Sequence, residues 1–197
     1  ICFYRKEKQK IPKETADIWI RKYHPSFNYT KTIIIKNKPK SIKKPKMSVE
    51  LAEFIGALAG DGHLHKKPAE LSITCHKNDD QKYMFYLSKR FQFLFGQEPT
   101  IIYQNNCIKL RFYNQELIKW INVSCEFPIG KKKNKLKIPK KIKNNKTYLI
   151  YYLRGLFDTD GSICRHHKNS GAIVDISSGD QNFLLEINEC LSSLGFK

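Results

Sequence analysis

The chain has 197 residues, with 36 lysines and arginines against 18 aspartates and glutamates, a formal net charge of +18. The length suffices for one well-packed core or two small ones, and the positive excess favours a polyanionic partner such as DNA or RNA. The six cysteines include no Cys-x-x-Cys pair, so neither a zinc module nor a disulfide framework is indicated. We see no secretory signal pattern and no run of the roughly 20 apolar residues that a membrane span needs. We therefore expect an intracellular protein, in the cytoplasm, nucleoid or an organelle, without a membrane partner.

Residues 1–46 form a basic N-terminal segment. Within it, residues 11–23 combine an early proline, an acidic first turn, apolar residues at helical spacing and a basic end, which predicts a helix. This helix fits a partial helix-turn-helix and a plain amphipathic helix equally well. Residues 36–46, rich in lysine and proline, predict a solvated linker that can lie along phosphates.

A short apolar helix ending in Asp-Gly occurs twice, as FIGALAGDG over 54–62 and as LRGLFDTDG over 153–161. A carboxylate at the C-terminal end of a helix meets the negative end of the helix dipole. Asp61 and Asp160 are therefore unfavourable for folding alone and predict a compensating cation. Two carboxylates close together repel each other unless they bind a metal, and hard oxygen ligands suit magnesium.

Small residues spaced four apart predict a close contact between the two motif helices. They are Gly56 and Gly60 in the first copy and Gly155 and Thr159 in the second. Each pair lies on one helix face, where small side chains let two backbones approach. We expect Gly62 and Gly161 to take the left-handed conformation that commonly ends a helix, leaving the two aspartates at the helix tips.

The first motif opens a repeat that spans residues 47–122. Alternation and turn signals predict strands over 63–66 and 70–76, a helix over 79–95, strands over 100–104 and 107–112, and a helix over 115–121. The order is helix-strand-strand-helix-strand-strand-helix, with antiparallel hairpins covered by helices on one face. The fold class is therefore α+β.

The second motif opens a second repeat over residues 148–197, with strands predicted over 162–165 and 172–178 and a helix over 181–194. Too few residues follow Asp160 for the last two strands and the final helix. We therefore expect this repeat to be truncated and the chain, which begins with isoleucine, to be a fragment. A basic linker over 123–147 joins the repeats. Its lysine run, which includes Lys131, Lys132 and Lys133, fits a solvated loop and a phosphate-contacting linker equally well.

Strand alternation assigns side chains to the two faces of each sheet. The apolar set, expected toward the helices, is Leu64, Leu71, Ile73, Cys75, Ile108, Leu110 and Phe112. The opposite face carries His63, His65, Ser72, Thr74, His76, Lys109 and Arg111 in the first repeat, and Ser162, Cys164, His166, Asp175 and Ser177 in the second. Such a polar, basic face can enter the major groove of DNA and recognise base edges; a merely solvated sheet face is the alternative.

The two motifs resemble those of the LAGLIDADG homing endonuclease family, in its two-motif, single-chain form. The second copy matches the family pattern at nearly every position, and the resemblance extends from about residue 49 to the end of the chain. The first copy keeps Gly56, Asp61 and Gly62. It departs only at apolar or small residues, namely Phe54, Ile55, Ala57 and Ala59.

The resemblance implies tandem pseudo-symmetric αββαββα repeats whose saddle-shaped sheets bind a long double-stranded DNA target, in a monomer with a pseudo-twofold axis. Asp61 and Asp160 would hold Mg²⁺ together with the carbonyl oxygens of Gly60 and Thr159. The implied reaction is a staggered double-strand break that promotes intron or intein mobility, as in a mobile genetic element. The family mechanism also uses a basic residue near each scissile phosphate. Lys109 is our candidate, with Arg111 or His76 as alternatives.

Two other functions fit the same fold. One is an intron-encoded RNA maturase, which assists splicing by holding intron RNA. The other is a non-catalytic DNA-binding regulator that uses the N-terminal segment for recognition. The presence of both Asp61 and Asp160 favours a nuclease. Within the nuclease interpretation, an intein-embedded protein is an alternative, although no splicing block is visible in the sequence.

Overall fold

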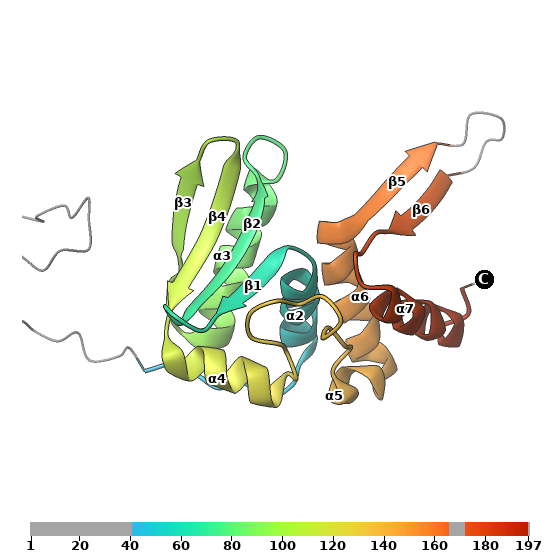
Figure 1. Ribbon diagram of the computed structural model, residues 1–197, viewed down its shortest axis with the longest axis horizontal. Helices are drawn as coiled ribbons and strands as arrows, with labels where there is room; N and C mark the ends of the chain where they lie inside the picture. Colours follow the sequence, from blue (N-terminus) through green and yellow to red (C-terminus); the bar gives the residue numbers. More distant parts are fainter. Residues whose placement is uncertain (1–40, 166–171, 197) are drawn as a thin grey trace, which may run out of the picture. The chain divides into compact units, whose positions relative to one another are not determined.

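The computed structural model describes residues 41–165 and 172–196 (Figure 1). The helix predicted over 11–23 and the predicted DNA contact His166 lie outside these residues. Over the described ranges, no helix has both the length and the apolar character needed to cross a membrane.

The first repeat follows the predicted order of elements. It comprises α2 (Val49–Asp61), β1 (Gly62–His65), β2 (Glu70–His76), α3 (Gln81–Phe95), β3 (Thr100–Gln104), β4 (Cys107–Tyr113) and α4 (Gln115–Ser124). Its strands form one antiparallel sheet in the order β1-β2-β4-β3. The predicted αββαββα layout and the α+β class are confirmed.

Local side-chain chemistry sets the ends of these helices. The Ser48 hydroxyl accepts a hydrogen bond from the Leu51 amide and caps α2, and the Asn114 side chain accepts from the Leu117 amide and caps α4. Helix α3 ends at Gly96, which has a φ of 68° and so adopts the left-handed conformation that suits glycine.

The core lies between the helices and one face of the sheet. All seven apolar strand residues that we expected on this face are buried: Leu64, Leu71, Ile73, Cys75, Ile108, Leu110 and Phe112. Phe54 of α2 packs edge-on against Phe91 and Phe95 of α3, with ring centroids 5.9 and 5.7 Å apart. None of the described helices covers the opposite face of the sheet, as strand alternation predicts (Figure 1).

The second repeat begins with the second motif helix. Its elements are α6 (Lys146–Asp160), β5 (Gly161–Arg165), β6 (Ala172–Ile176) and α7 (Gln181–Ser193). Strands β5 and β6 form a two-stranded antiparallel sheet. A short helix that the sequence analysis did not predict, α5 (Lys140–Lys143), precedes α6 in the lysine-rich linker. The Asn145 side chain accepts from the Tyr148 amide and starts α6 at this point.

Helices α2 and α6 lie side by side with their backbones in contact (Figure 1). A Cβ atom placed on Gly56 would overlap the carbonyl oxygen of Tyr152, and one placed on Gly155 would overlap the carbonyl oxygen of Glu53. The two glycines therefore permit an approach that no other residue allows.

The expectation for Gly62 and Gly161 is wrong. Both are extended, with φ of −89° and −90°, because each motif helix passes directly into a strand rather than into a turn. Glycine is needed for space instead. A Cβ atom would overlap the Leu58 side chain at Gly62 and the Phe157 side chain at Gly161.

We expect Gly56→Ala to destabilise the protein, because the added methyl group forces α2 and α6 apart. Overpacking of this kind costs about 1–3 kcal/mol, which corresponds to a fall in Tm of roughly 3–10 °C for a chain of this size. Thermal unfolding followed by circular dichroism measures the change. Gly179→Ala is the control, because nothing lies within 4 Å of a Cβ atom at Gly179. Equal Tm values for the two variants would contradict a tight α2–α6 contact.

Candidate active site

The carboxylates of Asp61 and Asp160 lie at the C-terminal ends of α2 and α6. These ends are close together, since a Cβ atom on Gly60 would lie 3.1 Å from Cγ of Asp160 and would overlap the Thr159 hydroxyl. Burial, and after it the negative charge of Asp160, raise the pKa of Asp61 to about 6. The two carboxylates therefore belong to one electrostatic site.

Lys132 supplies a cation at this site. Its Nζ donates hydrogen bonds to the carbonyl oxygens of Ala59, at 2.8 Å, and Gly60, which lie in the last turn of α2. An ammonium group here offsets the negative end of the helix dipole. Its charge also lowers the pKa of both Asp61 and Asp160 against the effect of burial. The cation that the helix dipole predicts is thus, at least in part, a side chain of the protein.

The segment between α4 and α5, residues 125–139, is packed rather than a solvated loop; we refer to it as the connector. Gly130 N donates to the Leu64 carbonyl at 2.8 Å, and Asn134 N donates to the Asp180 carboxylate at 2.6 Å. Further along, Ile138 N donates to Glu186 of α7 at 3.0 Å. The connector also buries four apolar side chains of the core: Cys125, Phe127, Leu136 and Ile138. These contacts hold Lys132 at the helix ends, whereas its neighbours Lys131 and Lys133 are exposed.

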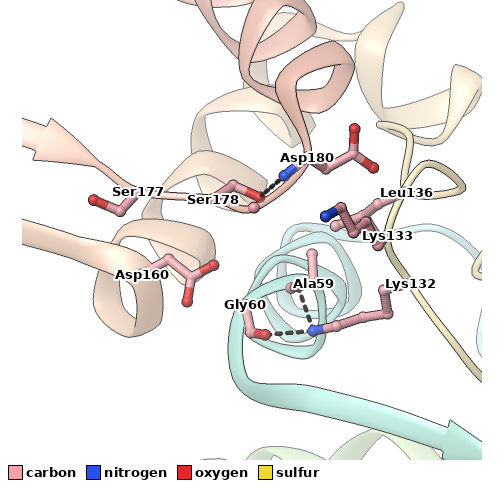
Figure 2. A pocket seen from close by; sticks show the side chains of 10 residues that line it. Ala59, Gly60, Lys132, Lys133, Leu136, Asp160, Ser177, Ser178 and Asp180 are labelled. Carbon is pink, nitrogen blue, oxygen red and sulfur yellow. Dashed lines mark hydrogen bonds between the residues drawn. The ribbon is translucent and has the colours of Figure 1, made fainter.

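A cavity of about 330 Å³ opens beside the helix ends, and Figure 2 shows its lining. The lining residues are Ala59, Gly60, Lys132, Lys133, Leu136, Asp160, Ser177, Ser178, Gly179 and Asp180. In Figure 2, Asp160 and Lys132 approach Gly60 from opposite sides. The cavity combines two ammonium groups, two carboxylates and two serine hydroxyls. It can therefore hold an anionic group beside a cation.

The oxygen donors fit a divalent cation such as magnesium. Magnesium commonly binds one or two carboxylates and completes its shell with water and substrate phosphates, and Asp61 and Asp160 offer two carboxylates that repel each other. Over residues 41–165 and 172–196, no three His, Cys, Asp or Glu side chains come together as a metal-binding group. Cys75 Sγ lies 3.9 Å from an Asp61 oxygen as a hydrogen-bond donor, and burial raises the pKa of this thiol to about 12. Without a bound metal the thiol therefore stays protonated at neutral pH.

The polar face of the first sheet carries the predicted side chains in register. His63 lies opposite Ser72 on the neighbouring strand, and Ser72 lies opposite Arg111. The rings of His63 and His65 are 4.1 Å apart. The expectation that Ser72 is exposed is wrong, because larger side chains on both neighbouring strands cover it and leave it 3% exposed. Thr74 lies opposite Lys109 on the same face.

Lys109 and Arg111 are paired with an acid on this face that the sequence analysis did not single out. Glu70 lies 3.3 Å from Lys109 Nζ and 2.8 Å from an Arg111 amine nitrogen. His76 pairs with Asp79 at 2.7 Å. The catalytic role of Lys109 stays a prediction. The lysine that the structure places at the helix ends is Lys132, which the sequence analysis had grouped with its neighbours as a phosphate contact.

The second sheet is shorter and more exposed. Ser162 donates a hydrogen bond to Asp175 on the neighbouring strand, and Cys164 is exposed. Ser177 follows β6 and lines the cavity beside Asp160. The Thr159 hydroxyl donates a hydrogen bond to the Leu156 carbonyl of the same helix at 2.9 Å. The hydroxyl also lies against Gly60.

Comparison with known proteins identifies the family. The model of a LAGLIDADG-like domain matches residues 147–197. The fold matches the homing endonuclease I-DmoI in a structure of its mesophilic variants, with a TM-score of 0.53, 17% identity, and coverage of 75% of this chain and 72% of that one. Its complex with DNA and Mn gives a TM-score of 0.53, 16% identity, and coverage of 75% and 78%. Residues 147–197 form a LAGLIDADG-like domain, and the chain has the fold of a homing endonuclease. The family prediction is confirmed.

Two curated relatives are much longer than the matched segment. The chain is 27% identical over 159 residues to the ribonucleoside-diphosphate reductase NrdEB subunit alpha of Bacillus subtilis (strain 168), covering 74% of this chain and 14% of that protein. It is 32% identical over 124 residues to the replication factor C small subunit of Methanocaldococcus jannaschii. This match covers 59% of this chain and 6% of that protein. The chain therefore spans only a small part of either relative.

A buried carboxylate ties the first LAGLIDADG helix to its neighbours. Glu53 of α2 is 2% exposed and accepts hydrogen bonds from the Tyr86 hydroxyl, at 2.8 Å, and from Arg90, at 3.1 Å, both on α3. Arg154 of the second LAGLIDADG helix lies 3.5 Å from the same carboxylate. Because α2, α3 and α6 all contribute, this cluster fixes α2 in place beneath the site.

We expect Asp61→Asn to stabilise the metal-free protein, and more so at neutral than at acid pH. The folded-state pKa of Asp61, about 6, lies above its ordinary 3.8, so ionisation costs folding free energy as the pH rises through this window. Solvent screening at the exposed tip leaves an effect of about 1 kcal/mol, or roughly 2–4 °C in Tm.

The measurement is the Tm in EDTA at pH 4 and pH 7.5. Glu98→Gln, which removes an exposed acid in the loop after α3, controls for net charge. If Asp61→Asn increased the Tm by the same amount at both pH values, the raised pKa of Asp61 would be contradicted.

Proposed function

We propose that this chain acts as a site-specific DNA endonuclease that makes a divalent-metal-dependent, staggered double-strand break in a long target. The observation that carries the proposal is the pair of carboxylates, Asp61 and Asp160, at the touching ends of α2 and α6, with Lys132 beside them. The helix dipole disfavours negative charge at this position, so two carboxylates there do not stabilise the fold. Their position is better explained by a role in function.

Each residue of the site has a role in this proposal. Asp61 and Asp160 hold Mg²⁺, with one carboxylate serving each DNA strand. When bound, the metal neutralises charge at the scissile phosphate and lowers the pKa of an attacking water molecule. The ammonium group of Lys132 has three N–H donors and uses two on Ala59 and Gly60, which leaves one for a phosphate oxygen. Exposed Lys133 adds positive charge at the cavity rim.

The proposed substrate is duplex DNA, bound by one monomer. The net charge of +18 supplies the phosphate attraction, and the polar faces of the two sheets supply side chains for base edges. Solved structures of I-DmoI, which share this fold, hold DNA with Mn and DNA with Ca. They support a DNA substrate and a divalent cofactor for this chain.

We further infer that the nuclease is embedded in a host protein. The two relatives carry names of unrelated activities, a nucleotide reductase and a replication factor, and each matches over a small part of its length. A module shared by otherwise unrelated proteins is typical of an inserted element. This favours the intein over the intron within the proposed mobility role.

We expect Asp61→Asn and Asp160→Asn each to retain DNA binding and to lose cleavage of at least one strand. Loss of a group that stabilises transition-state charge costs about 10²-fold or more in rate. The assay incubates the chain with a library of randomised 40-base-pair duplexes and Mg²⁺, and sequences the cut ends. Undiminished cutting by the double variant would overturn the proposed roles. Selective retention of intron RNA without cutting would point to a maturase, and DNA binding without cutting would point to a regulator.

We expect Lys132→Met to slow cleavage about 10²-fold while changing DNA affinity little, because Lys132 acts at the cavity. Exposed Lys131 is the matched control from the same run. Lys131→Met should leave the cleavage rate at saturating protein unchanged and reduce the salt dependence of binding by about one charge. Single-turnover cleavage and filter binding at several salt concentrations separate the two effects. Equal changes in cleavage rate and in salt dependence for the two variants would contradict a role of Lys132 in the active site.

A further inference from the structure

Glu70 is a buried acid on the polar face of the first sheet. It is 4% exposed, and it is the only acidic residue in β1–β4. Its neighbours in register are His65 on β1 and Tyr113 on β4. A buried carboxylate on a face proposed to bind a polyanion is doubly unfavourable unless it organises the groups around it.

The contacts of Glu70 fix Arg111. One carboxylate oxygen accepts from an Arg111 amine nitrogen at 2.8 Å, and that nitrogen also donates to the Tyr113 hydroxyl. The guanidinium lies over the Tyr113 ring, 5.0 Å from its centroid. A carboxylate and an aromatic ring therefore set both the position and the plane of the guanidinium.

Arg111 keeps donors that the protein does not use. Its Nε is buried without a hydrogen-bond partner, and its Nη1 makes no hydrogen bond to any described residue. One oxygen of Glu70 also lacks a hydrogen-bond partner, although Lys109 Nζ lies 3.3 Å away. Arg111 is in the middle of the face, opposite Ser72 and Thr100 on the flanking strands. Its side chain is 30% exposed, so Nη1 is the donor left for a ligand, whereas the buried Nε is not.

This arrangement suits a base edge better than a phosphate. Glu70 cancels one of the two positive charges of Lys109 and Arg111, which weakens their non-specific attraction to DNA. A guanidinium held in one plane retains its geometric selectivity, and the remaining Nη1 donor suits the O6 or N7 acceptor of guanine in the major groove.

We propose that Arg111 recognises a guanine of the target and that Glu70 is its positioning residue. This inference rests on the proposed function, because it names one determinant of the sequence that the endonuclease selects. Glu70 acts without touching DNA, by keeping Arg111 and Lys109 away from the phosphates.

The test selects bound duplexes from a randomised library with the 197-residue chain and its variants, and sequences them. We expect the wild-type motif to contain a position that prefers guanine by about 5- to 100-fold. Arg111→Ala should abolish the preference at that position alone. Glu70→Gln should weaken it, tighten binding to unselected DNA, and increase the salt dependence by about one charge as Lys109 and Arg111 gain phosphate contacts.

Glu98→Gln makes the same change in net charge at an exposed loop and should leave the motif unchanged. If the wild-type motif survives at every position in both Arg111→Ala and Glu70→Gln, the proposed guanine recognition by Arg111 is overturned. The endonuclease proposal stays intact in that case. Failure of the wild-type chain to enrich any duplex would overturn both. Circular dichroism confirms that each variant is folded, and Arg111→Ala alone tests the guanine contact if Glu70→Gln fails to fold.

Discussion

The backbone contact between α2 and α6 is the constraint on which the rest of the site depends. Gly56 and Gly155 let each helix approach the carbonyl oxygens of the other, at a distance that excludes any side chain. The contact brings two helix C-termini together, and with them two carboxylates in an environment that raises the pKa of both. Close packing thereby creates a concentration of negative charge that the chain must balance.

The connector provides part of that balance, and its own packing explains how. Lys132 reaches the end of α2 because residues on either side of it are held elsewhere, Gly130 against β1 and Asn134 against the Asp180 cap of α7. Formation of the site therefore requires both repeats to be folded. One lysine serves two carboxylates, so the two halves of the site are not equivalent even though the motifs repeat.

The sequence was sufficient for features that depend on local periodicity. Strand alternation identified the buried face, and the two Asp-Gly motifs identified the helices that pair. Other features depend on contacts distant in sequence. The covering of Ser72 by neighbouring strands, the extended conformation of Gly62, and the choice of Lys132 among adjacent lysines have no local pattern. Glu70 could have been noticed as the sole acid in a basic sheet, although its pairing with Arg111 requires the strand register.

Basic side chains of two kinds occur in this protein, those held by a buried acid and those exposed to solvent. Glu53 and Glu70 each hold an arginine at a fixed position, Arg90 between helices and Arg111 on the sheet face. Most lysines in the connector are instead exposed. Free cations attract any phosphate backbone, whereas a cation held in one orientation favours particular partners. A strongly basic protein gains selectivity by neutralising part of its own charge, which is why acids on its polar face are informative about recognition.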